Sequence, residues 1–179
     1  MKVYYKFGLF LAFILVLNSC ATLKKQVKTS AEKEMPTDKE IEHSFYLIGD
    51  AGNSNLGEST KALKAFKTEL ESASKNSTAI FLGDNIYDAG LPKTTDVEYE
   101  LAKHRIKVQI DAVKKFKGKT VFIPGNHDWY SGISGLENQE KIVEKALGKD
   151  SFLPENSCPI DKIHISDDIE LIVIDTHWY

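Results

Sequence analysis

Three short blocks of the sequence carry side chains that could bind metal ions. Each pairs a glycine with an oxygen-bearing residue: Gly49-Asp50, Gly83-Asp84 and Gly125-Asn126. Carboxylate and amide oxygens are hard ligands suited to Mn, Mg, Fe or Zn. A glycine before each ligand permits a tight turn and a close approach of the backbone. Two metal ions about 3.5–4 Å apart need a bridging ligand, which the carboxylate of the middle block can supply.

The third block continues with a group that could move a proton. His127 and Asp128 follow directly after Asn126. A histidine beside a carboxylate is a general acid whose pKa can be tuned. A histidine standing alone would be interpreted as a surface or helix-capping residue, but its place between two oxygen-bearing residues favours a functional role. We therefore predict that His127 and Asp128 act catalytically.

Apolar runs precede the three blocks and are expected to be β-strands. They cover residues 44–48, 78–82 and 120–123. Continuous apolar runs bounded by Gly and Pro are typical of strands that are buried on both faces of a sheet.

Helical patterns lie between these runs, and Ser59 or Thr60 could cap the first of them. The apolar stripes fall at Leu63, Phe66, Leu70 and Ala73; at Ala102, Ile106, Ile110 and Val113; and, more weakly, at Leu136, Val143 and Leu147. Residues 162–166 and 170–175 are expected to form either an antiparallel hairpin around Asp167-Asp168 or a continuation of the sheet. The alternation predicts an α/β fold with a largely parallel sheet. Since ligands bind at the carboxyl ends of such strands, the three blocks should converge on one edge.

In order and position, the blocks resemble the GDxG, GDxxY and GNH(D/E) motifs of purple acid phosphatases, a branch of the calcineurin-like metallophosphoesterase superfamily. The matching segments are Gly49–Gly52, Gly83–Tyr87 and Gly125–Asp128. The resemblance covers about residues 45–179. It implies the N-terminal half of a metallophosphoesterase β-sandwich, built from βαβαβ units and flanked by helices. It also implies a centre of two divalent or trivalent ions (Fe, Mn or Zn) that hydrolyses phosphate esters.

The resemblance assigns four metal ligands. Asp50 would bind the first metal, Asp84 would bridge both, and Asn126 would bind the second. Tyr87 would be the tyrosinate that gives Fe(III) enzymes of this branch their purple colour. The first block departs from the wider superfamily, which has a histidine where this sequence has Gly52. Tyr87 would compensate for that loss.

The resemblance also assigns the acid and its partner. His127 would bind the phosphate and protonate the leaving oxygen, and Asp128 would orient the histidine. Trp129 and Tyr130 are expected either to flank the mouth of the site or to cap the core. The remaining histidines are interpreted as structural or solvated residues: His43, His104, His164 and His177.

Two further motifs of the family, VxxH and GHxH, do not occur in the sequence. The resemblance therefore implies that four of seven metal ligands are present. We expect the sequence to be the N-terminal part of a longer protein, or a truncated reading frame. In that form it should bind metal weakly and turn over little substrate.

The N-terminus has the pattern of a bacterial lipoprotein. Two lysines precede an apolar run at residues 7–17, which has the length of a signal-peptide core and is short for a membrane span. Leu17–Cys20 resembles a lipobox, so we expect a signal peptide at 1–19 and a lipidated Cys20. An ordinary signal peptide or a short membrane anchor is the alternative.

The expected product is tied to the membrane of the bacterial cell envelope by its lipid. A polar segment at residues 20–43 would be a tether, and the domain would occupy residues 44–179. Ala21 follows the cysteine in place of the aspartate that marks inner-membrane retention in some bacteria. This favours the outer membrane.

Composition limits the other functions. The 179 residues are 42% hydrophobic and 27% charged, with a net charge of −3, so no basic face for a nucleic acid is expected. Two cysteines give no disulfide framework.

Two alternative functions remain. The segment Gly52–Ser59 has the spacing of a nucleotide-binding loop, but Glu58 replaces the lysine of that loop and would repel phosphate. The other alternative is a non-catalytic surface lipoprotein that retains the fold as a binding module.

Overall fold

A computed structural model of the chain describes residues 40–178. The expected signal peptide, the lipidated Cys20 and the tether up to residue 39 lie outside the described residues. In chain order the elements are β1 (Ser44–Ile48), α2 (Lys61–Ser72), β2 (Ser77–Phe81), α3 (Tyr99–Val113), β3 (Lys119–Phe122), α4 (Asn126–Trp129), α5 (Gly132–Leu147), the 3-10 turn η1 (Glu155–Ser157), β4 (Ile160–Ser166) and β5 (Ile169–Ile174).

The first three strands form a parallel sheet in the order β1-β2-β3. Ile48 pairs with Phe81, and Phe81 pairs with Phe122, so the three strands end side by side. The predicted α/β fold with a parallel sheet is confirmed. β2 and β3 each begin and end one residue earlier than the apolar runs suggested. The register brings the three glycine-containing blocks to one edge of the sheet.

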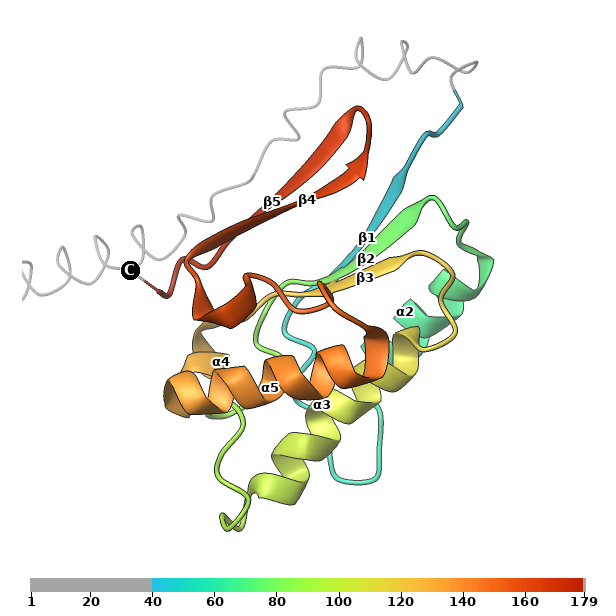
Figure 1. Ribbon diagram of the computed structural model, residues 1–179. Helices are drawn as coiled ribbons and strands as arrows, with labels where there is room; N and C mark the ends of the chain where they lie inside the picture. The colour runs from blue at the N-terminus through green and yellow to red at the C-terminus, as the bar shows by residue number, and fades with distance from the viewer. Residues whose placement is uncertain (1–39, 179) are drawn as a thin grey trace, which may run out of the picture. The chain divides into compact units, whose positions relative to one another are not determined.

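Helices α2, α3 and α5 lie on one side of this sheet and bury the main core (Figure 1). The rings of Phe81 and Phe122 stack there, with centroids 4.0 Å apart. The predicted stripes are confirmed on the inward faces of the helices, most completely in α3, where all four members are buried. α2 begins after Thr60, whose side chain accepts a hydrogen bond of 3.2 Å from the Leu63 amide, as expected of an N-cap.

The predicted hairpin is also confirmed: β4 and β5 pair in antiparallel fashion on the other side of the sheet (Figure 1). A small second core of Val121, Leu153 and Val173 joins it to β3. The hairpin does not bury β1. Phe45 and Leu47 are 41% and 57% exposed, so the expectation that this strand is buried on both faces is wrong. β1 has a strand neighbour only in β2 among the described residues, and only its helix-facing side chains are covered.

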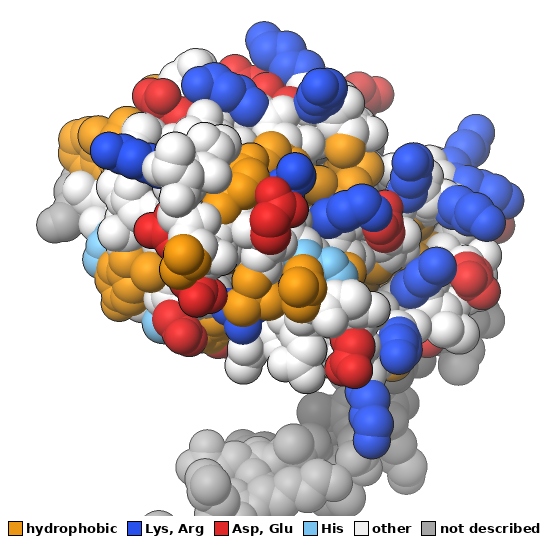
Figure 2. Space-filling view, turned by 90° about the horizontal axis from the view of Figure 1, so that it is seen from below, with side chains coloured by type: hydrophobic (Ala, Val, Ile, Leu, Met, Phe, Trp, Pro, Cys, Tyr) orange, Lys and Arg blue, Asp and Glu red, His pale blue; other side chains and the backbone are white. Residues whose placement is uncertain are grey.

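The helix-covered side carries Lys and Arg side chains interspersed with Asp and Glu (Figure 2). Within residues 40–178, no helix has both the length and the apolar character needed to cross a bilayer. Cys158 is exposed and has no disulfide partner in this part of the chain.

Candidate functional site

The loops after β1 and β2 are joined backbone to backbone. The Gly52 amide donates to the Asp84 carbonyl at 3.0 Å, and the Tyr87 amide donates to the Gly52 carbonyl at 3.1 Å. Asp50 and Asp84 both adopt φ of 53°, a left-handed conformation that is uncommon outside glycine and concentrates at functional sites. Two equivalent, strained aspartates are therefore held side by side at the ends of neighbouring strands.

Three oxygen atoms meet at this edge. The Tyr87 hydroxyl donates to Asp50 Oδ1 at 2.6 Å and lies 3.0 Å from Asp84 Oδ2. The hydrogen bond to Asp50, followed by burial and by the hydrogen bond to Asp84, raises the pKa of the Tyr87 phenol above its ordinary value. The two carboxylates and the phenol are thus close enough to share one cation.

Close backbone packing explains two glycines of the motifs. A Cβ atom at Gly52 would overlap the backbone of Asn85, and one at Gly125 would overlap Asp84. Gly52 stands where the wider superfamily has a histidine. Without a backbone rearrangement that side chain cannot be placed here, because the loop after β2 occupies its space. As the two loops are packed here, the position of Gly52 accepts only glycine.

His127 lies over the same edge. Its backbone amide donates to Asp84 Oδ1 at 3.1 Å, and its ring packs against that of Tyr87 with centroids 4.3 Å apart. The ring nitrogen Nδ1 lies 2.5 Å from the carbonyl oxygen of Asp88. Because a carbonyl only accepts, this contact places a proton on Nδ1 and leaves Nε2 as the nitrogen that could exchange a proton with a substrate.

Asp128 does not orient His127 as expected from the resemblance. It is completely buried, and its oxygens accept hydrogen bonds from the backbone amides of Asn85, Ile86 and Gly125 at 2.8–3.1 Å, and from the Asn85 side chain at 3.2 Å. Burial raises the pKa of Asp128 to about 6, although the backbone donors oppose the shift. The Asp88 carbonyl is the partner of the histidine ring instead, and Asp128 binds the loop after β2 to the loop after β3.

The fourth predicted ligand, Asn126, lies at the rim. Its Nδ2 donates to the Tyr130 hydroxyl at 2.7 Å, which leaves Oδ1 as the atom that could bind a cation. Tyr130 is 56% exposed and flanks the site, whereas Trp129 is half-buried and donates to Asp175 Oδ2 at 2.7 Å. Trp129 and Tyr130 were expected either to flank the mouth of the site or to cap the core; Tyr130 flanks the site, and Trp129 packs against the core.

The sequence analysis set His177 aside, but the structure brings it to the site. A cleft of about 420 Å³ is lined by Asp50, Asp84 and Asn126, and His177 lines the same cleft. The buried Asp175 positions it, because Oδ1 accepts from the His177 amide at 3.0 Å. The sequence signal that could have pointed to His177 is the Asp175-Thr176 pair directly before it, at the end of an apolar run.

Other histidines also differ from expectation. His43, placed in the tether, bonds through Nε2 to the Thr78 hydroxyl at 2.9 Å. His104 is half-buried and its Nε2 lies 2.8 Å from the Glu58 carbonyl, so it is not simply solvated. His164 is 81% exposed and close to Glu170, as a solvated residue would be.

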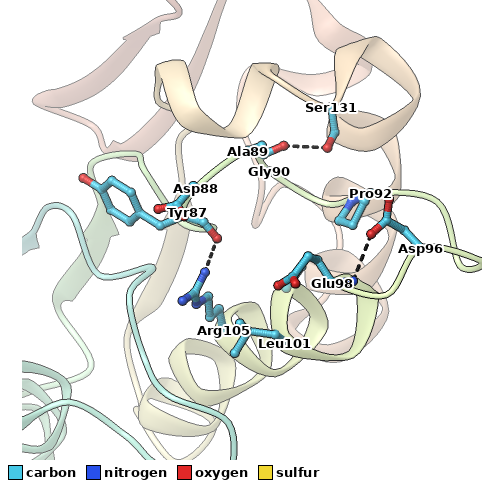
Figure 3. A pocket seen from close by; sticks show the side chains of 11 residues that line it. Tyr87, Asp88, Ala89, Gly90, Pro92, Asp96, Glu98, Leu101, Arg105 and Ser131 are labelled. Carbon is cyan, nitrogen blue, oxygen red and sulfur yellow. Dashed lines mark hydrogen bonds between the residues drawn. The ribbon is translucent and has the colours of Figure 1, made fainter.

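A second cavity, of about 350 Å³, lies behind Tyr87 (Figure 3). Its polar lining includes Asp88, Asp96, Glu98 and Arg105. The Tyr87 ring points away from Arg105, toward the sheet edge, while its carbonyl faces the guanidinium. Arg105 was not singled out in the sequence, although it is the only arginine there.

The residues present fit a hard cation in chemistry but supply few ligands. The predicted donors are all oxygen atoms, and three of them already converge, as a Mn, Fe or Zn site of this type requires. Within residues 40–178, no group of three or more His, Cys, Asp or Glu side chains is placed to hold a metal ion. Tyr87 and Asn126 must therefore take part if the two aspartates bind a metal here.

Comparison with known proteins shows the wider family to which the motifs point. A family model described as calcineurin-like phosphoesterase matches residues 43–175. No curated protein matches the chain. The matched range begins immediately before β1 and ends at Asp175, and it contains all three blocks.

Proposed function

Because the chain belongs to the calcineurin-like phosphoesterase family, we propose that it hydrolyses phosphate esters at a centre of two metal ions. The proposed ligands are side-chain oxygens gathered at one sheet edge, those of Asp50, Asp84, Tyr87 and Asn126. Family members generally use divalent metals. Tyr87 further favours the purple acid phosphatase branch, with Fe(III) in the first position and Fe, Mn or Zn in the second.

One observation carries the proposal: the Tyr87 hydroxyl lies within 3.0 Å of carboxylate oxygens from the loops that follow two different strands, β1 and β2. Two adjacent carboxylates repel each other, and a cation between them would offset that repulsion. When bound, a metal pair would neutralise the dianionic phosphate and activate a water molecule. Asp84, whose two oxygens face Tyr87 and the His127 amide, is the residue proposed to bridge the pair.

His127 is proposed to protonate the leaving oxygen of the ester. Its Nδ1 is held by the Asp88 carbonyl, so the ring orientation is fixed, and the imidazolium form would give up its proton from Nε2 to the leaving oxygen. His177, which lines the same cleft as Asp50 and Asp84, is proposed to contact the substrate.

The wider setting of the enzyme is also a proposal. The histidine-containing motifs of the family would supply the remaining ligands from a region that follows Tyr179 in the intact protein. Lipidation at Cys20 would anchor the protein in the bacterial envelope, at the outer membrane, with residues 20–43 as its tether.

The test measures metal binding and hydrolysis together. The chain, and any longer product of the same reading frame, would be titrated with Fe, Mn and Zn and assayed on an aryl phosphate with and without a chelator. Tyr87→Phe should lose affinity and the visible absorption of an Fe(III)-tyrosinate, whereas Tyr99→Phe on α3 should behave like wild type. A wild-type protein that neither binds metal nor cleaves mono- or diesters would refute the proposal.

A second candidate is a non-catalytic binding module on the cell surface. It is favoured by the lack of any three-residue His, Cys, Asp or Glu group within the described part of the chain. It predicts no hydrolysis of phosphate esters, even in the longest product. The hydrolysis assay therefore separates the two candidates.

A further inference from the structure

Arg105 is the only arginine among the 23 basic residues of the sequence. It lies on α3, half-buried, and its guanidinium reaches two loops that are far apart in sequence. Nε donates to the Ser54 carbonyl at 3.1 Å, one terminal nitrogen donates to the Tyr87 carbonyl, and the other donates to Asn53 Oδ1 at 3.3 Å. One side chain thus holds the loop after β1 and the loop after β2 together.

The two loops are those that carry the proposed metal ligands. Asp50 lies three residues before Asn53, and the carbonyl bound by Arg105 belongs to Tyr87 itself. Gly52 already joins the loops at their near end through its backbone hydrogen bonds. Arg105 joins them at the far end, behind the Tyr87 ring, which points away from it toward the aspartates (Figure 3).

The geometry of the contact requires a guanidinium. Arginine presents several N–H donors in a rigid planar fork, whereas lysine offers one flexible ammonium. Each of the three guanidinium nitrogens donates to one acceptor here, and the three acceptors come from two loops, so the planar group sets the spacing between the loops. A lysine at this position could satisfy one loop but could not hold both at a fixed distance.

We propose that Arg105 is a positioning residue that sets the distance between Asp50 and Tyr87. It acts through Tyr87 and touches neither metal nor substrate. In this role it pre-organises the oxygen cluster, in the way that residues behind the ligands of a metal site orient them. The consequence for metal affinity rests on the function proposed above, whereas the consequence for loop order does not.

The test compares Arg105→Lys and Arg105→Gln with His104→Ala. The control removes a neighbouring α3 contact, to the Glu58 carbonyl, which does not involve Tyr87. Zn affinity of the full chain would be measured by titration calorimetry, and exchange of the Gly52 and Tyr87 amides by hydrogen–deuterium exchange without metal. Thermal melts would show that each variant is folded, and Asn53→Ala provides a milder variant should both arginine substitutions unfold the domain.

We expect both arginine variants to bind Zn about 10–100-fold more weakly. Their Gly52 and Tyr87 amides should exchange faster, while those of β2 keep their protection and His104→Ala resembles wild type in both measurements. Wild-type affinity and exchange in Arg105→Lys would overturn the proposal, as would equal losses in His104→Ala. Were wild type itself to bind no Zn, the proposed function would fail, and the exchange data alone would decide the role of Arg105.

Discussion

The phenolic oxygen of Tyr87 lies 2.6 Å from Oδ1 of Asp50, although 37 positions separate the two residues in the sequence. Parallel pairing of β1 with β2 places their following loops side by side, and the Gly52 carbonyl accepts the Tyr87 amide. The contact is therefore a product of sheet topology. It brings a third oxygen to within hydrogen-bond distance of the carboxylates of Asp50 and Asp84.

Replacing Asp84 should remove metal and activity together. Its two oxygens face Tyr87 and the His127 amide, and it is the proposed bridging ligand. Asp84→Asn would be compared with Asp111→Asn, an exposed aspartate on α3 that pairs with Lys107. Metal content by elemental analysis and aryl phosphate hydrolysis are the measurements. Normal metal content in Asp84→Asn would exclude the bridging role.

Replacing His127 should separate chemistry from metal binding. In the longest active product, His127→Ala should keep its metal. The kcat on esters with poor leaving groups should fall by about 10²–10⁴, the usual contribution of a positioned acid. Activated aryl esters should suffer less, because their leaving groups need less protonation. Loss of metal would make His127 a ligand, and retention of both metal and rate would make it structural.

Asp128→Ala should destabilise the fold of the domain. The substitution leaves three backbone amides and the Asn85 side chain without their acceptor in a fully buried site. The expected loss is about 2–5 kcal/mol in the free energy of unfolding, measured with urea. Asp111→Ala, at an exposed surface pair, should change it by less than about 1 kcal/mol. Equal effects would show that the buried acceptor has no special role.

Two glycines of the first block should respond differently to alanine. A Cβ at Gly49 would lie 3.9 Å from Leu82 Cβ, an ordinary contact, whereas one at Gly52 would overlap the Asn85 backbone. Gly52→Ala should therefore lower the free energy of unfolding by about 1–3 kcal/mol, and Gly49→Ala should change it little. Urea midpoints of the two variants provide the comparison. A tolerated Gly52→Ala would mean that the loops are not packed as closely as the structure shows.

Cys20 should carry a lipid, because it follows a basic start and an apolar run of signal-peptide length. Mass spectrometry of the mature N-terminus from bacterial membranes should show a modified cysteine. Cys20→Ala should appear in the detergent-free fraction, and Cys158→Ala should remain with the membranes. An intact Met1, or cleavage at another site, would contradict the prediction.

The elements of the fold could be predicted because their signals are local. The apolar stripe that includes Ile106 and Ile110 has helical spacing whatever the helix packs against. Thr60 caps α2 through a hydrogen bond that spans only three residues. The strand ends could also be located, within one residue, from glycines that follow apolar runs. From these ends alone, convergence of the three blocks at one sheet edge could be inferred.

The hydrogen-bond partners of individual side chains could not be predicted in the same way. Asp128 is adjacent to His127 in sequence, yet it binds the loop of Asn85, because a buried carboxylate takes the nearest unpaired amides regardless of chain order. Nothing local distinguishes Arg105 from a solvated basic residue on a helix. Its function appears only when two loops, about 50 and 20 positions away, meet its guanidinium.

By itself the sequence determined the family, the α/β order of elements and which side chains could serve as ligands, since these depend on residue types and short spacings. Tertiary structure decided which face of β1 is exposed, that His177 lines the cleft with Asp50, and that Tyr87 lies against the aspartates. The reason is that such contacts join segments distant in the chain, and only the packed register of strands and helices sets the distances between them.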